Sequence, residues 1–360
     1  MFHRYRYLSR CAAFLALAFA AAGPVSAETF SFVALGDTAY DLPKDVLVYE
    51  ALIATINKAQ PAFSIHVGDT WGANVCSDAE QNKVLATFGK YEQPIVYTPG
   101  DNEWVDCRKP EVLAAYLRFV GGAATPADLA LLGKARGFED SFTLGSYDDG
   151  LDRLAAIRRI FFAKPASLGK RPLPLTRQAD VSPFKDMVEN ARWEHGGVLF
   201  ATVNMPGSNN DFFANSEARA LDAIRRTKAD VAWIKAVFDE AKAHSAKAVV
   251  IAMQAAMFDG GEGDEDFGQR LRGGSGGPFY WVARAIRDYG AAFGGPVLLI
   301  NGDDHAFIVD RPFRVARSET NAPKYDNITR LQVFGAPDLR AVRVTVDTAT
   351  SWVFGFAPLY

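Results

Sequence analysis

The chain has 360 residues, of which 49% are hydrophobic, 12% aromatic and 22% charged, with a formal net charge of −3 at pH 7. This composition is typical of a globular protein with a large buried core, and it excludes a disordered or fibrous chain. The slight acidic excess and the lack of a basic patch predict no binding to nucleic acid or to anionic membranes.

The N-terminal segment has the pattern of an export signal. A start with three arginines precedes a short apolar core at 12–22 and a small-residue cleavage site at 25–27. We therefore predict a signal peptide over 1–27, a mature domain over 28–360, and a secreted or periplasmic protein. Loss of three arginines and no acids would take the charge from −3 to −6. No later stretch reaches about 18 apolar residues, so we expect no membrane anchor once the signal is removed.

Four Gly-Asp pairs each follow a short apolar run that is typical of a buried parallel strand. These strands are predicted at 30–35, 63–67, 94–97 and 297–300. The pairs that follow them are Gly36-Asp37, Gly68-Asp69, Gly100-Asp101 and Gly302-Asp303. Because ligands bind at the carboxyl edge of such a sheet, we expect the four carboxylates to converge.

Convergence of these carboxylates would favour a metal site. Clustered carboxylates raise one another's pKa unless cations neutralise them. The alternative is that each aspartate only caps a helix or forms a turn, which would explain any one of them. The whole set, with His305 close behind the last pair, favours the metal site. A fifth pair, Gly263-Asp264, follows no apolar run and does not belong to the set.

The remaining elements alternate between helix and strand over most of the chain. Helices are predicted at 41–60, 77–90, 110–120, 151–159, 215–244 and 279–289, and further strands at 197–203, 247–253, 329–334, 341–347 and 351–356. This alternation predicts an α/β fold with right-handed crossovers. Residues 121–185 break it and are interpreted as an insertion that shapes the rim of the site. The Gly-rich, acidic stretch 259–277 predicts a mobile loop over the site. The helix at 215–244 has an apolar stripe predicted to pack in the core, formed by Leu221, Ile224, Trp233, Ile234, Val237 and Phe238.

Two cysteines remain after the predicted signal peptide, which contains Cys11. Cys76 and Cys107 each follow a Gly-Asp pair by a few residues. In an exported chain, such a pair favours a disulfide that braces the rim of the site. A reactive thiol is the weaker interpretation, because neither cysteine has a histidine nearby in the sequence.

The order of these motifs resembles the calcineurin-like metallophosphoesterases over residues 30–310. The resemblance implies a four-layer α/β/β/α sandwich, with central β-sheets flanked by helices, that hydrolyses phosphate esters with divalent metal ions. Several signature residues differ. The first family motif, Asp-x-His, is here Asp37-Thr-Ala39, and Gly-Asn-His-Asp/Glu is Gly100-Asp101-Asn102-Glu103. The histidine of the fourth motif is replaced by Gln254, and the last motif, Gly-His-x-His, keeps only His305.

Carried over by position, the resemblance implies two metal positions bridged by Asp69. The first would be held by Asp37, Asp69 and His305. The second would be held by Asp69, Asp101, Gln254 and Asp303. Tyr40 could replace the ligand missing at Ala39, as a tyrosine does in the related purple acid phosphatases, or it could only pack.

The departures from the family pattern carry chemical consequences. Carboxylate and amide oxygens suit Mg²⁺, Mn²⁺ or Ca²⁺, whereas imidazole suits zinc and iron, so we predict the harder cations. Two such ions about 3.5–4 Å apart would activate a bridging water. Asn102 stands where the family has a histidine that assists the leaving group. Its amide can stabilise the reacting group by a hydrogen bond but cannot act as a general acid.

Five further residues are candidates for supporting roles. His66 is predicted to be a hydrogen-bonded residue inside a strand that supports a ligand, and Glu103 to fix loop geometry or orient a ligand. Asp304, beside the last Gly-Asp pair, is a possible ligand. Arg192 and Asn204 could bind phosphate, although a solvated loop explains them equally well.

Two functions remain open at this point. The first is an exported metal-dependent phosphoesterase acting on a small-molecule or phosphorylated substrate. The second is a catalytically weak or inactive protein of the same fold that binds a metal or a phosphorylated ligand. The lost histidines favour the second. The retention of coordinating groups at the replaced ligand positions favours the first.

Overall fold

The computed structural model describes residues 29–73, 76–107, 114–115, 118–119, 121–134, 150–212, 216–258, 277–313 and 325–360. The predicted signal peptide, most of the helix predicted at 110–120 and nearly all of the loop predicted at 259–277 lie outside these ranges. Within them, no helix combines the length and the apolar character needed to cross a membrane.

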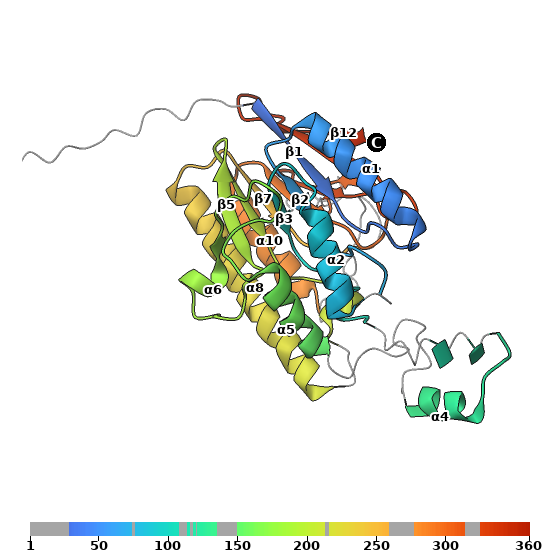
Figure 1. The fold of residues 1–360 in the computed structure, drawn as a ribbon. Coiled ribbons are helices and arrows are strands. Elements are labelled where there is room, and N and C mark those ends of the chain that lie inside the picture. Colours follow the sequence, from blue (N-terminus) through green and yellow to red (C-terminus); the bar gives the residue numbers. More distant parts are fainter. Residues whose placement is uncertain are drawn as a thin grey trace, which may run out of the picture.

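Two mixed β-sheets form the centre of the molecule (Figure 1). The first has the strand order β12-β11-β1-β2-β3. Its strands are β1 (Thr29–Leu35), β2 (Ser64–His66), β3 (Ile95–Tyr97), β11 (Ala341–Asp347) and β12 (Phe354–Leu359). Strands β1, β2 and β3 are parallel, whereas β11 is antiparallel to both β1 and β12. The three Gly-Asp strands of the N-terminal part therefore end at one edge, as expected.

The second sheet has the order β4-β5-β6-β7-β8-β10-β9. Its strands are β4 (Thr176–Arg177), β5 (Ala191–His195), β6 (Val198–Thr202), β7 (Ala248–Ala252), β8 (Val297–Asn301), β9 (Ile308–Asp310) and β10 (Ile328–Gln332). Strands β6, β7, β8 and β10 are parallel. Every residue of β6, β7 and β8 is buried, because these apolar strands are covered on both faces.

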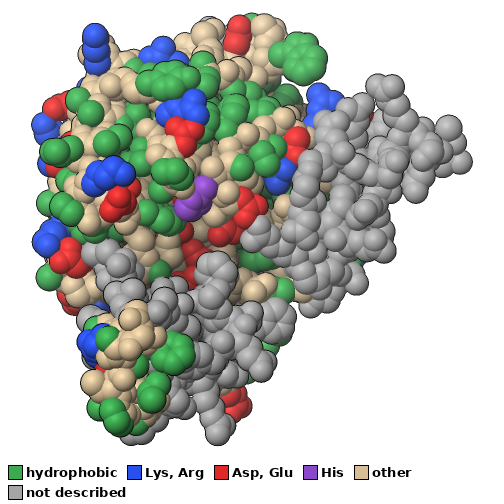
Figure 2. All heavy atoms as spheres, turned by 90° about the vertical axis from the view of Figure 1, so that its right-hand side faces the viewer, with side chains coloured by type: hydrophobic (Ala, Val, Ile, Leu, Met, Phe, Trp, Pro, Cys, Tyr) green, Lys and Arg blue, Asp and Glu red, His purple; other side chains and the backbone are tan. Residues whose placement is uncertain are grey.

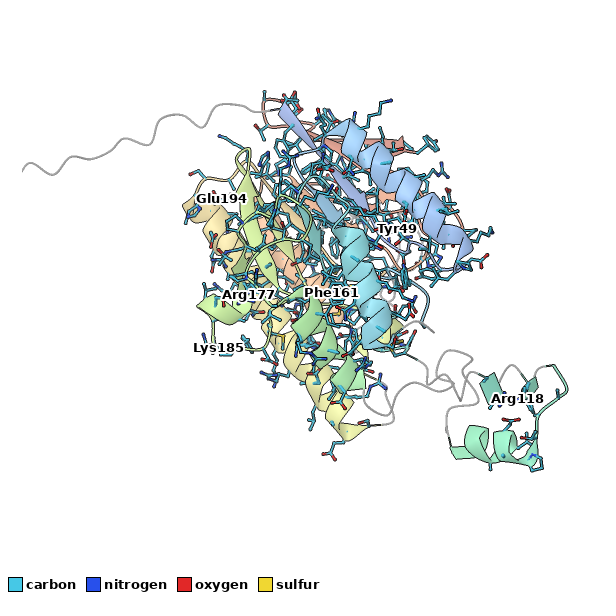
Figure 3. All side chains as sticks on the ribbon, in the orientation of Figure 1. Tyr49, Arg118, Phe161, Arg177, Lys185 and Glu194 are labelled. Carbon is cyan, nitrogen blue, oxygen red and sulfur yellow. A yellow bond between two sulfur atoms is a disulfide. The ribbon has the colours of Figure 1, made fainter. Side chains whose placement is uncertain are left out.

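Helices cover the outer face of each sheet, which confirms the predicted α/β/β/α sandwich (Figure 1). Helices α1 (Lys44–Ala59), α2 (Asp78–Phe88) and α5 (Gly150–Phe161) pack on the first sheet, and α8 (Glu217–Ala243) and α10 (Tyr280–Phe293) on the second. The shorter helices are α4 (Pro126–Lys134), α6 (Gln178–Val181) and α7 (Gly207–Asn210). One apolar cluster fills each of the three spaces between layers. Tyr49 of α1 and Phe161 of α5 belong to the cluster between the first sheet and its helices (Figure 3).

Helix α8 buries four of the six residues predicted for its apolar stripe, Trp233, Ile234, Val237 and Phe238, and exposes the other two. Leu221 and Ile224 are 57% and 38% exposed, so their assignment to the core was wrong. Arg219 and Arg226 are buried instead, because the loop before the helix supplies their partners. Arg219 Nε donates to Asp211 Oδ2 at 2.9 Å, and Arg226 Nη2 donates to a backbone carbonyl of the same loop at 2.9 Å. Apolar periodicity alone could not reveal these partners.

The last strand and the predicted insertion at 121–185 also differ from what the sequence predicts. The last strand begins three residues later than predicted, at Phe354, because Thr350 N donates to Asp347 O and closes a turn before it. Part of the predicted insertion packs against the first sheet and its helices. Helix α5 contacts α2, and the backbone of Leu168 exchanges hydrogen bonds with Ile95 of β3. The segment therefore protects an edge of the first sheet.

The predicted disulfide is confirmed. Cys76 and Cys107 are joined, with their Cα atoms 5.7 Å apart. The bond links the loop after β2 to the loop after β3, and these loops carry Asp69 and Asp101. With a sequence separation of 31 between the two cysteines, closing this loop stabilises the fold by about 3–4 kcal/mol in the chain-entropy account.

Candidate metal centre

The strand ends of both sheets bring six of the predicted residues to one end of the molecule. They follow β1, β2, β3, β7 and β8 and are Asp37, Asp69, Asp101, Gln254, Asp303 and His305. Asp37, Asp69, Asp101 and Gln254 are all buried. Acidic side chains and a histidine lie side by side near the middle of the face in Figure 2.

Four of these residues have a backbone conformation that ordinary residues rarely adopt. The φ angles are +49° at Asp37, +52° at Asp69, +79° at Asp303 and +57° at His305. Each left-handed residue other than glycine costs about 1–2 kcal/mol. Such strain persists only where the surrounding structure fixes it, and it is concentrated at functional sites. The conformation thus marks these turns as a candidate site, with aspartate and histidine among the residues that adopt it most readily.

His305 is held so that one ring nitrogen faces Asp37. Its Nδ1 lies 2.6 Å from the carbonyl oxygen of Ala336 and therefore carries a proton. Nε2 is then directed toward Asp37 Oδ1, which is 3.5 Å away. An imidazole lone pair facing a carboxylate oxygen is unfavourable unless a proton or a metal cation lies between them. This fixed tautomer is the one that metal-binding histidines use.

Tyr40 and Asn102 both donate hydrogen bonds to Asp69. The Tyr40 hydroxyl lies 2.5 Å from Asp69 Oδ2, and Asn102 Nδ2 lies 2.9 Å from the same oxygen. Asn102 also donates to Asp69 Oδ1 through its backbone, at 3.2 Å, and to the Tyr40 oxygen through Nδ2, at 2.8 Å. Burial and the Asp69 carboxylate raise the pKa of Tyr40 well above its ordinary value. In the metal-free protein Tyr40 is therefore a neutral donor to Asp69.

Gln254 joins the carboxylates of Asp101 and Asp303. Its Nε2 lies 3.2 Å from Asp101 Oδ1 and 3.3 Å from Asp303 Oδ1. Its Oε1 accepts a hydrogen bond from the backbone N–H of Gly207, which fixes the orientation of the amide. The second oxygen of Asp303 accepts from the backbone N–H of Ala256 at 2.9 Å. The amide nitrogen of Gln254, and not its oxygen, thus faces the acids.

Burial and mutual repulsion raise the pKa of the three buried aspartates. The pKa of Asp37 is raised well above its ordinary value by burial and then by Asp303. Burial, followed by Asp101, does the same for Asp69. Burial and the nearby Asp106 raise the pKa of Asp101 to about 7. A divalent cation would favour the ionised forms and reverse these shifts.

Glu103 and His66 support the loops behind the site. Glu103 accepts hydrogen bonds from the backbone N–H groups of Thr70 at 2.6 Å, Gly100 at 2.7 Å and Asp69 at 3.1 Å, so it fixes the geometry of two carboxylate-bearing loops. His66 Nδ1 accepts from the backbone N–H of Gly68 at 3.2 Å. Burial lowers the pKa of His66 to about 3, so its ring is neutral.

Two candidates from the sequence, Arg192 and Asn204, have partners away from this group, and a third, Asp304, is exposed. Arg192 pairs with Glu240 of α8, with its guanidinium carbon 4.7 Å from the centroid of the Trp233 ring. Asn204 is buried, and its Nδ2 donates to Glu189 Oε1 at 2.6 Å. Asp304 is exposed. Arg192 and Asn204 are engaged elsewhere in the fold, and we do not assign them to substrate binding.

Gly207 and Ser208 are functional candidates that the sequence reasoning missed. A Cβ atom built on Gly207 would lie 2.4 Å from Asp303 Oδ1 and 2.7 Å from Asp101 Oδ2, so this backbone lies against both carboxylates. Ser208 donates to Asp106 Oδ2 at 2.7 Å. The Pro-Gly-Ser turn after β6 was the available signal, because only glycine permits so close an approach.

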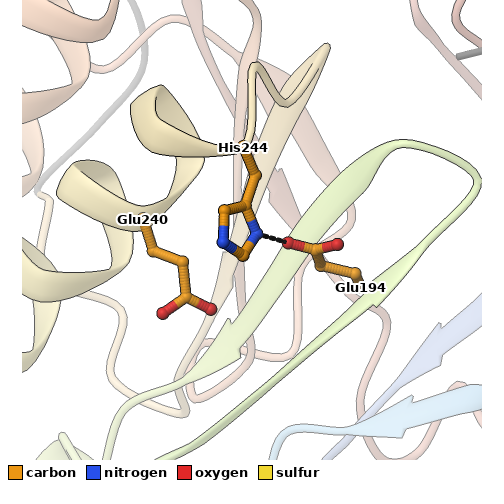
Figure 4. A group of neighbouring side chains, drawn as sticks. All are labelled: Glu194, Glu240 and His244. Atoms are coloured by element: carbon orange, nitrogen blue, oxygen red, sulfur yellow. Dashed lines mark hydrogen bonds and ion pairs between the residues drawn. The ribbon is translucent and has the colours of Figure 1, made fainter. Parts of the chain in front are cut away.

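A second group of acids lies outside this site. Within the described ranges, Glu194, Glu240 and His244 form the one group of three or more His, Cys, Asp or Glu residues whose ligand atoms all lie within 4.8 Å of one another (Figure 4). His244 Nδ1 is hydrogen-bonded to Glu194, and Glu240 pairs with Arg192. The ligand atoms of the buried carboxylate site are consequently farther apart than those of this surface group.

Comparison with known proteins finds solved structures of low similarity to this chain. No family model and no curated protein matches the sequence. Thirty chains of solved structures match. PhoD is 13% identical, over 89% of this chain and 64% of PhoD, with a TM-score of 0.48. A dimetal phosphatase from Danio rerio is 9% identical, over 92% and 98% of the two chains, with a TM-score of 0.47.

A third match is GAP50, described as the anchor in the inner membrane complex of Plasmodium. It is 10% identical, over 92% of this chain and 88% of that chain, with a TM-score of 0.41. The chain spans less than two thirds of the length of PhoD. Likenesses with TM-scores below 0.5 carry no argument about activity, so the case for function rests on this chain's own residues.

Proposed function

We propose that this protein is an exported, metal-dependent phosphoesterase that hydrolyses a phosphate mono- or diester. The observation that carries the proposal is the pairing of Asp37 with His305 Nε2 at 3.5 Å, among buried aspartates on strained turns. Buried carboxylates are found in proteins when they are paired or bind a metal. Export is supported by the Cys76–Cys107 disulfide, since such bonds persist in oxidising compartments.

The donor set fits a hard divalent cation. Asp37, Asp69 and His305 would hold it, supplying carboxylate oxygens and one imidazole nitrogen. This mixture favours Mg²⁺, Mn²⁺ or Ca²⁺ over zinc or iron. A bound cation of this kind lowers the pKa of a coordinated water and polarises a phosphoryl oxygen.

The chain's own residues orient the site and stabilise charge. Tyr40 and Asn102 hold the Asp69 carboxylate in one orientation. The half-buried Asn102 amide would stabilise negative charge that develops on a phosphoryl group by redirecting one of the two N–H donors that now bind Asp69 and Tyr40. Because an amide cannot deliver a proton, the leaving group departs without a general acid at this position. We therefore expect activity on activated aryl esters to exceed activity on alkyl esters.

The test is an assay of the purified mature protein on an activated aryl phosphate monoester and diester, with Mg²⁺, Mn²⁺, Ca²⁺ or Zn²⁺ added in turn. We expect cation-dependent turnover that Asp69→Asn abolishes. Asp239→Asn is the matched control, since Asp239 is an exposed acid that pairs with Lys235 on α8. Turnover that persists in Asp69→Asn, or that needs no cation, would contradict the proposal.

A binding protein without catalysis is the second candidate. Its support is that Asn102 Nδ2, which stands where the family has a catalytic histidine, already donates to Asp69 and Tyr40. Tight cation binding with no turnover on either ester would favour this candidate over the enzyme.

A further inference from the structure

We propose that the site holds one divalent cation per chain, because the side-chain amide of Gln254 fills the place that a second cation would need. This inference rests on the proposed function, since it specifies the cation content of the same site. It departs from the two metal positions implied by the family resemblance.

The half of the site formed by Asp37 and His305 has the geometry of a cation position. Two metal–ligand bonds of about 2.1–2.3 Å, at angles near 100°, place their ligand atoms about 3.3–3.5 Å apart. Asp37 Oδ1 and His305 Nε2 are 3.5 Å apart. The Nδ1 bond to the Ala336 carbonyl leaves Nε2 as the coordinating atom. This half therefore presents two ligand atoms at the spacing of neighbouring ligands on one cation.

The half formed by Asp101 and Asp303 is already bridged by the protein. Gln254 Nε2 lies between one oxygen of each carboxylate, at 3.2 and 3.3 Å. An amide NH₂ group has two N–H donors, so it can satisfy both oxygens at once. Donor hydrogens between two acids occupy the place where a cation would bind and partly replace its charge.

The Gln254 amide cannot turn its oxygen toward the acids without losing its hydrogen bond to the Gly207 backbone. Its Oε1 accepts the backbone N–H of Gly207, so a rotated amide would direct N–H against N–H. The Gly207 backbone also lies against both carboxylates, since a Cβ atom there would come within 2.4 Å of Asp303 and 2.7 Å of Asp101. Coordinating atoms and waters of a second ion would have to displace this backbone.

Asp69 is the residue that the resemblance makes the bridge between two metals. Its carboxylate oxygens already accept hydrogen bonds from the protein. Its Oδ2 accepts hydrogen bonds from Tyr40 at 2.5 Å and from Asn102 Nδ2 at 2.9 Å. Its Oδ1 accepts the Asn102 backbone N–H at 3.2 Å. Three donors leave one of about four lone-pair sites, and there the Asp69 side chain meets that of Asp101, so this site can serve one cation but not a bridge.

Metal content tests the inference without relying on activity. The mature protein is dialysed to equilibrium against saturating Mn²⁺, and bound manganese per chain is measured by elemental analysis. Low-temperature electron paramagnetic resonance then distinguishes isolated ions from a spin-coupled pair. The variant is Gln254→Glu, which removes the NH₂ donor and adds a carboxylate. Gln60→Glu makes the same change on an exposed residue at the end of α1.

We expect one ion per chain with an isolated signal for the wild type and for Gln60→Glu, and two ions with a coupled signal for Gln254→Glu. Two ions in the wild type would overturn the inference and leave the proposed function standing. A Gln254→Glu protein that folds and still binds one ion would overturn the role given to Gln254. No bound manganese in the wild type would overturn the proposed function itself, and the inference with it.

Discussion

Two groups in this molecule combine acids with a histidine, and they differ in burial and in charge compensation. Glu194, Glu240 and His244 lie at the surface with their ligand atoms close together, yet Arg192 and the histidine already pair with the acids (Figure 4). At the buried site, by contrast, Asp69 and Asp101 accept hydrogen bonds from neutral donors, among them Tyr40, Asn102 and Gln254.

The comparison teaches that close approach of acids is a poor guide to cation binding. Exposed acids that pair with an arginine have little to gain from a metal ion. Buried acids whose partners are neutral carry uncompensated negative charge, which a cation or protons must neutralise. The strained turns at Asp37 and Asp69 have no counterpart at Glu194 or Glu240.

The largest expected effect is on Mn²⁺ affinity. Asp37→Asn should weaken binding by more than the ~100-fold that loss of a supporting partner typically costs, because it removes a direct ligand. Glu240→Gln should leave the affinity unchanged. Equilibrium dialysis of both variants measures the difference. An equal loss in the two variants, or a loss in Glu240→Gln alone, would reverse the assignment of the two groups.

The second effect is a fall in the stability of the metal-free protein as pH rises. Asp101 has a pKa of about 7 in the folded state, against an ordinary value near 3.8. The folded state therefore binds more protons than the unfolded state between these values, and stability decreases with pH across that window. At ~1.36 kcal/mol for each pH unit between the two pKa values, the upper bound for this group is roughly 4 kcal/mol.

Thermal unfolding at pH 5 and pH 8, with and without Mn²⁺, measures this effect. We expect a lower midpoint at pH 8 than at pH 5 in the presence of a chelator, and a rise on adding Mn²⁺ that is larger at pH 8. A metal-free protein that becomes more stable between pH 5 and pH 8 would show that the acids are compensated in some other way.

The smallest effect is expected at the surface group. Glu194 raises the pKa of His244, mainly through their hydrogen bond. This pair stabilises the fold below the ordinary histidine pKa near 6.5, and the contribution disappears as pH rises above the shifted value. Glu194→Gln should leave the unfolding midpoint unchanged at pH 8 and lower it slightly at pH 5. A change in Mn²⁺ affinity in this variant would contradict the distinction between the two groups.

Much of the fold and of the candidate site could be predicted from local patterns. Apolar runs followed by Gly-Asp located the strand ends and therefore Asp37, Asp69, Asp101 and Asp303. The two cysteines after such pairs correctly predicted the disulfide. These signals are local, because the burial of a strand and the turn after it depend on a few adjacent residues.

Other features could not be predicted because the sequence does not show which polar groups meet. Arg192 was a plausible phosphate ligand until Glu240, 48 residues later, proved to be its partner. The buried arginines of α8 broke an otherwise regular apolar stripe for the same reason. Tyr40 is a possible ligand by type, and its hydrogen bond to Asp69, 29 residues away, could not be predicted from the sequence.

The sequence by itself determined which chemical groups stand at the ends of the strands, since alternation, glycine and aspartate act over a few residues. Only the tertiary structure decided how those groups use their lone pairs and protons. Asp37 meets the loop of Asp303 across 266 residues, and Gln254 meets Gly207 across 47. A hydrogen-bond direction of this kind exists only after both sheets have packed, because each partner lies on a different strand end.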